Sequence, residues 1–440
     1  MARFLIATWP FSGHLFPQIS VATALRARGH QVAFYTGGRV RPLLGEEGFT
    51  AFPFRRVDED AVYDLIDTIE RRPVGWRAPG LFSSVLRRWL VETIPDQVAD
   101  LLLAIATWKP DVIISDPSMW APALVLRETT GLPVAISSFL IGSLIPGPDA
   151  PPWGMGLPAP RTARTRLLSA TVERATALLG SGLRRRVNEI RAIYDLPPLD
   201  RPVAALTADL PLSLVPSIPE LDYNRRDLPP SVHYVGPCVW NKRRTETLPA
   251  WLETLPTDKP IVHVTEGTIH RRDPFVLRAA AKGLAQMPVH AILTTGPQRR
   301  AEDVDLGPLA PNIQVEQWVS HADLLPFCSV LVTTGGAGTV MAALQAGVPL
   351  LIVPTHWDKP DNAQRVVAAG AGLRLAPERC TARRLRDAVR QLLWDPRFRT
   401  KAHRLSRELA ARPGPDGAAA LLEGLVPPLA RSATPALASA

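Results

Sequence analysis

Two residues near the ends of apolar runs could carry acid–base chemistry. His14 follows the run FLIAT (4–8) and a turn containing Pro and Gly, and Asp116 ends the run DVIISD (111–116). A histidine at the start of a helix can remove a proton from a bound hydroxyl group. A carboxylate beside it can orient the ring and stabilise its charged form. Asp116 precedes Pro117 and could equally cap a helix, which is compatible with the catalytic role. His14 could instead simply cap or pack.

A glycine-rich turn in the second half of the chain could bind phosphate. The segment TGGAGT (334–339) lies between an apolar run and a helical pattern. Its glycines let backbone N–H groups approach an anion at the positive end of the helix. It lacks the lysine of a Walker A loop, and a tight turn capped by Thr339 is the structural alternative. The turns VTEGT (264–268) and TTG (294–296) are weaker candidates. Since Glu266 would repel a phosphate, we expect its side chain to point elsewhere.

Alternating apolar runs and helical patterns must position these residues. The runs typical of buried strands lie at 4–8, 31–36, 111–116, 132–137, 212–216, 232–236, 261–267, 291–296, 313–319, 329–336 and 349–354. Continuous apolar strands joined by helices predict parallel sheets covered on both faces. We therefore expect an α/β protein with two Rossmann-like, doubly wound domains. In such sheets ligands bind at the carboxyl ends of the strands, here in the cleft between the domains.

A polar, Pro-bounded segment at 237–249 separates the two halves. It predicts an N-terminal domain over 1–236, a linker over 237–249 and a C-terminal domain over 250–425. The residues from 426 to 440 are expected to form a disordered tail. The stretch 143–160 is too rich in Pro and Gly for regular structure. Long loops of this kind are usually functional.

Composition excludes several classes of protein. The 440 residues suit two domains, and the three cysteines, with no export signal, indicate a cytoplasmic protein without disulfides. No Cys/His cluster has zinc-ligand spacing, and no apolar run is long enough to span a membrane. The formal net charge of +9 comes mostly from arginines scattered over expected helix faces. With no basic run interleaved with aromatic residues, this charge does not indicate nucleic-acid binding, although it could attract anionic ligands.

Large apolar side chains gather at strand ends and loops of the first half. They are Trp9, Phe11, Trp76, Phe82, Met119, Trp120, Phe139, Trp153 and Met155. Most residues of such a set are core residues in an ordinary protein. Because several lie in turns, they could instead line an apolar pocket for a small hydrophobic acceptor beside His14.

Six segments together resemble the family 1 glycosyltransferases, which use nucleotide sugars and have the two-domain GT-B fold. They are GHLFP (13–17), SDPSMWA (115–121), WVSH (318–321), TGGAGT (334–339), ALQAGVPLLIVP (343–354) and DKPDNAQRV (358–366). The resemblance extends to about residue 425. It implies that His14 is the general base, that Asp116 supports it, and that Trp318 stacks on the nucleotide base. Asp358 would then hold sugar hydroxyls.

The resemblance and the turns together give two sets of expected site residues. The donor set is Thr268, Trp318, His321, Thr334, Gly335, Gly336, Gly338, Thr339, Asp358 and Lys359. The acceptor set is Trp9, Phe11, Phe82, Met119, Trp120, Phe139 and Trp153.

The donor half departs from the family pattern at four positions. His321 replaces the usual Gln, Thr334 replaces a His, and Lys359 replaces the Gln beside the acid. Ala342 replaces the Glu that holds the ribose hydroxyls. These changes remove a carboxylate that would accept from the ribose and an imidazole facing the diphosphate. They add a cation that could supply positive charge instead.

We therefore expect an inverting glycosyltransferase that uses a nucleotide-sugar donor and needs neither a cofactor nor a metal ion. UDP-glucose is the expected donor and a TDP-sugar the alternative. The acceptor is expected to be a small lipophilic alcohol or phenol, such as a phenolic, polyketide or terpenoid. A sugar-nucleotide epimerase of the same fold would alter the donor without an acceptor. A non-catalytic auxiliary or binding protein is the other alternative, although such a protein has no need of His14 and Asp116.

Overall fold

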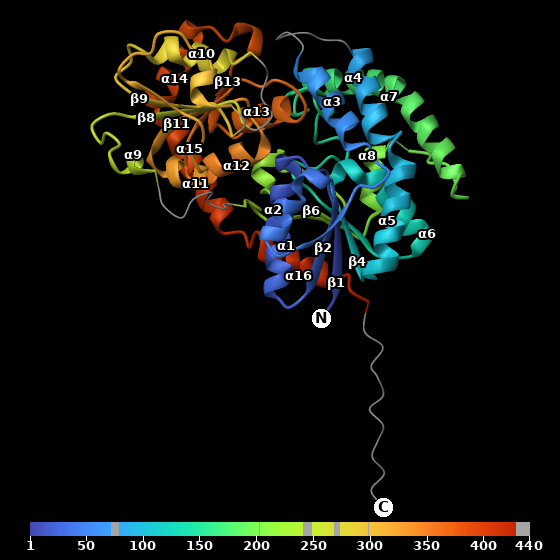
Figure 1. Ribbon diagram of the computed structural model, residues 1–440. Helices are drawn as coiled ribbons and strands as arrows, with labels where there is room; N and C mark the ends of the chain where they lie inside the picture. The colour runs from blue at the N-terminus through green and yellow to red at the C-terminus, as the bar shows by residue number, and fades with distance from the viewer. Residues whose placement is uncertain (72–78, 202, 241–248, 268–272, 298, 428–440) are drawn as a thin grey trace, which may run out of the picture.

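The computed structural model describes residues 1–71, 79–201, 203–240, 249–267, 273–297 and 299–427. These residues form two parallel β-sheets, each flanked by helices (Figure 1). The α/β class and the two doubly wound domains predicted from the sequence are confirmed. Most of the expected linker and most of the expected tail lie outside the described residues.

The first sheet has seven parallel strands in the order β3-β2-β1-β4-β5-β6-β7. Their bounds are β1 (Arg3–Ala7), β2 (Gln31–Thr36), β3 (Thr50–Pro53), β4 (Val112–Ser115), β5 (Val134–Ser137), β6 (Leu212–Val215) and β7 (Val232–Tyr234). The strand order reverses between β1 and β4, which is the point where such sheets bind ligands. Ala7 pairs with Ser115, so the two strands end side by side. His14 and Asp116 follow these two strands, and the topology alone therefore brings them together.

Helices cover both faces of this sheet. They are α1 (Ser12–Ala27), α2 (Arg41–Glu46), α3 (Glu59–Glu70), α4 (Pro79–Leu90), α5 (Ile94–Trp108), α6 (Trp120–Thr130), α7 (Ala163–Ala192) and α8 (Val203–Leu206). Separate apolar clusters lie on the two faces, one with Leu5 and Ile113 and the other with Phe4 and Val112. Strands buried on both faces explain why their sequences are continuously apolar rather than alternating.

The second sheet has six parallel strands in the order β10-β9-β8-β11-β12-β13. Its strands are β8 (Ile261–Thr265), β9 (His290–Thr294), β10 (Ile313–Glu316), β11 (Cys328–Thr333), β12 (Leu350–Ile352) and β13 (Gly372–Arg374). The helices of this half are α9 (Ala250–Glu253), α10 (Phe275–Leu284), α11 (His321–Leu324), α12 (Ala337–Gln345), α13 (Lys359–Ala368), α14 (Ala382–Trp394) and α15 (Pro396–Ala410). The strand order reverses between β8 and β11, and the glycine-rich turn follows β11.

The last helix, α16 (Pro415–Glu423), returns to the first sheet and lies beside α1 (Figure 1). Its apolar face, which includes Ala418 and Leu422, is buried in the same cluster as Leu15 and Leu25. Glu423 accepts hydrogen bonds from Arg28 and pairs with His30. The domain boundary drawn from the sequence placed residues up to 425 in the second domain, whereas residues 415–423 pack on the first.

Residues 138–162 contain no helix or strand, as the Pro and Gly content predicts. Among the residues that the structure describes, no helix is both long and apolar enough to cross a membrane.

Candidate functional site

His14 and Asp116 form a short contact at the end of the first sheet. His14 Nδ1 lies 2.6 Å from Asp116 Oδ2, with the His14 side chain 13 % exposed and the Asp116 side chain fully buried. Because a carboxylate only accepts, Nδ1 carries the proton and Nε2 is left with a free lone pair. Gly13, the residue before His14, is exposed, and a Cβ at that position would meet no atom, so the surface is open at the start of this helix. This is the geometry of a histidine able to accept a proton from a bound hydroxyl group.

Three further hydrogen bonds fix the Asp116 carboxylate. Oδ1 accepts from the backbone N–H of Ser118 at 2.7 Å and from its hydroxyl at 2.5 Å. Oδ2 also accepts from the Thr8 hydroxyl at 3.2 Å. Asp116 is at the same time the N-cap of the short 3-10 helix η2 (Pro117–Met119). The capping and the orienting roles that the sequence left open are therefore both present.

Aromatic rings surround His14. The Phe139 ring lies over it with a centroid distance of 3.8 Å, and Phe11 meets it edge-on at 5.6 Å. Trp89 lies 6.3 Å away and packs edge-on against Trp9. Of the expected acceptor residues, Phe11 and Phe139 thus contact the histidine directly.

The other expected acceptor residues are divided between core and surface. Trp9 and Met119 have no exposed surface, and Trp120 is 8 % exposed and packs beside α5 and α7. These three contribute to packing rather than to an open surface. Phe82 is half-buried against a tryptophan of the second domain, as described below, and Trp153 is exposed in the 143–160 loop. Trp76 lies outside the described residues.

The glycine-rich turn has the backbone geometry of an anion site. Gly335 has φ = +95°, and a Cβ there would lie 2.6 Å from Ile352 Cγ2, so this position requires glycine. Gly336 is the N-cap of α12, with no side-chain cap, and the backbone N–H groups of the first helical turn have no partner within the helix. A Cβ at Gly336 or Gly338 would meet no atom, so the N-terminus of α12 faces open space. Thr339 lies within this first turn.

A hydrogen bond joins the glycine-rich turn to the neighbouring strand of its sheet. The Thr334 hydroxyl donates to the backbone carbonyl of Glu266 at 2.9 Å, so this threonine ties the turn to the end of β8. Glu266 itself accepts from Arg299 at 3.0 Å and from the N–H of Val276 at 3.2 Å. Its carboxylate thus points away from the turn, as expected. Burial raises the pKa of Glu266, and Arg299 opposes this rise.

Helix α13 and its N-cap residue, Asp358, place two charged side chains beside the same turn. Lys359 packs against Gly335, and its ammonium donates to the Thr355 hydroxyl at 3.0 Å. Asn362 donates to the Gly335 carbonyl at 2.9 Å and to Asp358 at 2.7 Å. Burial raises the pKa of Asp358, while the hydrogen bond from Asn362 and the positive charge of Lys359 oppose this rise.

The remaining donor residues follow β10. Trp318 is partly exposed. The His321 ring packs edge-on against the His263 ring, with 5.7 Å between the ring centroids. Burial lowers the pKa of His321 to about 4, so its ring is neutral at physiological pH. A neutral imidazole thus stands where the family has a neutral amide. Thr268 lies outside the described residues.

Sequence reasoning missed a contact that crosses between the domains. Trp357 has φ = +63°, which is unusual for a bulky residue, and donates from Nε1 to Glu70 at 3.0 Å. Its ring packs against Phe82 at 5.4 Å and edge-on against Trp89 at 5.7 Å. The only signal in the sequence was the position of Trp357 next to Asp358. Nothing in the helical pattern distinguished Trp89 or Glu70.

Comparisons with known proteins identify the family of this chain. Residues 283–425 match the model of the erythromycin biosynthesis protein CIII-like C-terminal domain. The chain is 34 % identical over 430 residues to 4'-demethylrebeccamycin synthase of Lentzea aerocolonigenes, covering 97 % of this chain and 100 % of that protein. The chain belongs to the family 1 glycosyltransferases. It is a glycosyltransferase of the group that acts on natural products.

Two further comparisons concern a second relative and a solved structure. The glycosyltransferase is 29 % identical over 432 residues to demethyllactenocin mycarosyltransferase of Streptomyces fradiae, covering 98 % of this chain and 88 % of that protein. The solved structure of a spinosyn rhamnosyltransferase complexed with thymidine diphosphate matches with a TM-score of 0.69 and 22 % identity. That match covers 96 % of this chain and 100 % of the other. The GT-B fold expected from the sequence is confirmed.

Proposed function

We propose that this glycosyltransferase moves a sugar from a thymidine-diphosphate donor to a hydroxyl group of a lipophilic acceptor, with inversion at the anomeric carbon. The observation that carries the proposal is the 2.6 Å contact between His14 Nδ1 and Asp116 Oδ2, which leaves Nε2 to act as the base. The acceptor oxygen, as it loses its proton to Nε2, attacks the anomeric carbon opposite the leaving diphosphate. Asp116 stabilises the imidazolium ion that forms.

The negative charge that develops on the leaving diphosphate needs compensation. The N–H groups at the start of α12, the Thr339 hydroxyl and the positive end of the helix dipole can provide it. Lys359, which packs against Gly335, adds a full positive charge. We propose that these groups do the work that a divalent metal performs in other transferases. Turnover that survives an excess of chelator would support this part of the proposal, and loss of turnover that added Mg²⁺ restores would refute it.

The choice of thymidine over uridine rests on a missing side chain. Ala342, in α12, stands where the family pattern has a glutamate that accepts from the ribose hydroxyls. A thymidine donor has no 2′-hydroxyl group, and a buried carboxylate without its donor would be costly. The relatives named for mycarosyl and rhamnosyl transfer, one of them with thymidine diphosphate bound, support the same choice. UDP-glucose, the donor first expected from the sequence, is therefore the second candidate.

A binding screen separates these donors. Thermal unfolding with TDP, UDP and GDP at equal concentrations should give the largest shift with TDP, because a ligand that binds only the folded state stabilises it by mass action. Ala342→Glu should move the preference towards UDP. A larger shift with UDP for the wild-type protein would overturn the thymidine assignment. Incubation of the donor alone tests for epimerisation, and the anomeric configuration of a glycoside product tests for inversion.

A further inference from the structure

Helix α13 is held by the first domain as well as by its own. Arg365, on α13, donates through Nε and Nη2 to Asp222 Oδ1 at 3.2 and 3.0 Å. Asp222 ends the 3-10 helix η4 (Pro219–Asp222), which belongs to the first domain. Both side chains are buried, at 8 % and 0 % exposure. A buried ion pair of this kind is thus a direct link between the acceptor half and the donor half.

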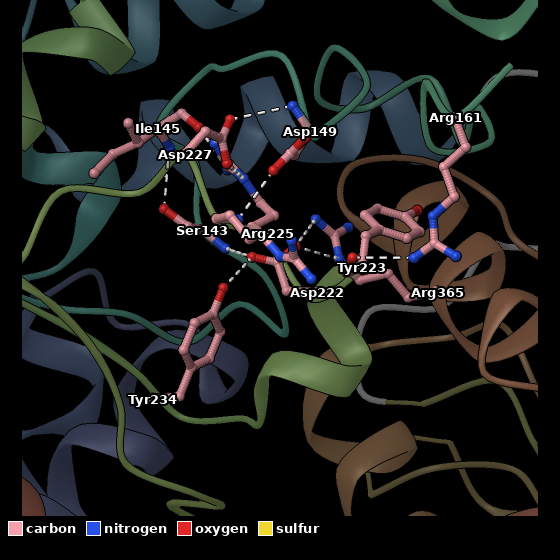
Figure 2. Close-up of polar contacts among 11 residues, drawn as sticks. Ser143, Ile145, Asp149, Arg161, Asp222, Tyr223, Arg225, Asp227, Tyr234 and Arg365 are labelled. Carbon is pink, nitrogen blue, oxygen red and sulfur yellow. Dashed lines mark hydrogen bonds and ion pairs between the residues drawn. The ribbon is translucent and has the colours of Figure 1, made fainter.

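Further donors fix the Asp222 carboxylate, as Figure 2 shows. Oδ2 accepts from the Tyr234 hydroxyl at 2.6 Å and from the N–H of Ser143 at 2.8 Å. The Arg365 guanidinium also lies over the Tyr223 ring, 5.2 Å from its centroid. Every hydrogen-bonding oxygen of Asp222 is therefore occupied, and the pair has little freedom to shift.

The 143–160 loop clamps the same helix one turn earlier. Asp361, four residues before Arg365 and on the same face of α13, accepts from the N–H groups of Gly154 and Gly156 at 2.6 and 2.7 Å. Arg374 donates to the Gly156 carbonyl at 2.7 Å. A Cβ at Gly156 would lie 2.7 Å from the backbone oxygen of Pro360. Close approach to α13 thus explains the glycine at position 156.

A second ion pair fixes the start of the loop within the first domain (Figure 2). Arg225 binds Asp227 through two bonds of 2.9 Å and donates to the Ile145 carbonyl at 2.7 Å. Asp149 N–H donates to Asp227 at 3.2 Å. The loop is therefore held at both ends, by the first domain near Phe139, which covers His14, and by the face of α13.

The neighbouring side chains of α13 belong to the donor site. Asn362 binds the Gly335 carbonyl and Asp358, and Lys359 packs on Gly335. We propose that Asp222 and Arg365 are positioning residues, which set α13 and its donor residues at the distance from His14 that sugar transfer requires. This inference rests on the proposed transfer reaction. A displacement of about 1 Å between reacting groups can cost about a hundredfold in rate, so a small shift of α13 would suffice.

The test compares variants of the contact between Asp222 and Arg365, here called the clamp, with matched controls. Arg365→Met removes the pair, Arg365→Lys keeps only its charge, and Gly142→Ala places a methyl group about 2.3 Å from Arg365 Nη2, which forces the pair apart without removing a charge. Arg191→Met is the control for the ion pair, since Arg191 binds Glu128 through two bonds that join α7 to α6 within the first domain. Gly182→Ala is the control for the methyl group, because a Cβ there meets no atom.

We expect Arg365→Met and Gly142→Ala to lower kcat about ten- to a hundredfold, with the Kd for TDP changed by a smaller factor than kcat. The kcat of Arg365→Lys should fall between that of Arg365→Met and that of the wild type. The TDP affinity should change less because the glycine-rich turn is tied to its own sheet through Thr334, whatever the position of α13. Arg191→Met should lower the unfolding temperature and keep kcat. Clamp variants whose kcat stays at the wild-type value would overturn the inference.

Hydrogen exchange gives a readout that does not depend on activity. The amides of Gly154 and Gly156 bind Asp361, so they should exchange faster in Arg365→Met than in Arg191→Met when the clamp opens. If their exchange is unchanged, the coupling is refuted even in an active enzyme. If these amides exchange faster in Arg365→Met but the wild-type protein transfers no sugar, the proposed function is refuted, while the structural coupling between Arg365 and the loop is supported.

Discussion

Replacing Asp116 with asparagine should inactivate the enzyme without unfolding it. Asp116 Oδ1 accepts two hydrogen bonds from Ser118, one of them from a backbone N–H. An amide nitrogen at that position would face a donor and leave it unsatisfied, at a cost of about 1–3 kcal/mol. The asparagine oxygen will therefore take the Oδ1 position, and its NH₂ group will point at His14 Nδ1, where Oδ2 now lies 2.6 Å away.

The consequence is a change of tautomer. Nδ1 must then accept a hydrogen bond, so the ring proton moves to Nε2, the atom expected to remove the proton from the acceptor. Loss of a general base costs about 10²–10⁴-fold in rate, which corresponds to about 3–5 kcal/mol in activation free energy. Because both Ser118 hydrogen bonds are preserved and the Thr8 hydroxyl, which now donates to Oδ2, can instead accept from the new NH₂ group, we expect the unfolding temperature to change by no more than about 3 °C.

The assay measures kcat for glycoside formation at saturating donor, together with the Kd for TDP and the unfolding temperature. Asp100→Asn is the matched control, because Asp100 is a buried aspartate that accepts hydrogen bonds from the Tyr35 hydroxyl and from the N–H groups of Arg55 and Arg56. It should keep its kcat. In a His14→Ala background, Asp116→Asn should add less than about threefold, since the two residues act as a unit. An Asp116→Asn enzyme that folds normally and retains more than a tenth of kcat would refute the tautomer argument.

Three other perturbations test separate parts of the structure. Lys359→Gln removes the ammonium of a residue whose carbonyl oxygen and Cβ lie beside Gly335, and it should weaken TDP binding about tenfold by calorimetry, an effect that shrinks at high salt; unchanged affinity would mean that Lys359 does not face the diphosphate. Gly335→Ala forces a side chain onto a backbone at φ = +95° and towards Ile352, so it should destabilise the fold by at least about 1–3 kcal/mol in urea unfolding, and a neutral result would contradict the turn geometry. The hydrogen bonds from Arg28 and His30 lower the pKa of Glu423 from 4.5 to about 2, so their stabilisation is present above about pH 4.5 and is lost as the pH falls towards 2. Glu423→Gln should lower the urea midpoint at pH 6, and its difference from the wild type should shrink below pH 4.5; a difference independent of pH would exclude this pair as its source.

The sequence determined the elements of the fold and most of the chemistry. Continuous apolar runs predicted the parallel strands, because burial on both faces requires apolar residues at every position. The positions of His14 and Asp116 after two such runs were enough to predict their meeting, since neighbouring parallel strands end at the same edge. Gly335 could be recognised as a turn residue for a local reason, since only glycine adopts its backbone conformation without strain.

Only the tertiary structure decided which aromatic residues reach the base and how the two halves are joined. Trp9 and Phe139 have the same apolar character in the sequence, yet one is fully buried and the other covers His14, because that outcome depends on packing between distant helices. The pairing of Asp222 with Arg365 links residues that are 143 positions apart in the chain. No periodicity or local propensity encodes such a contact. It follows from the way in which the 143–160 loop and the end of η4 meet α13 once both sheets are in place.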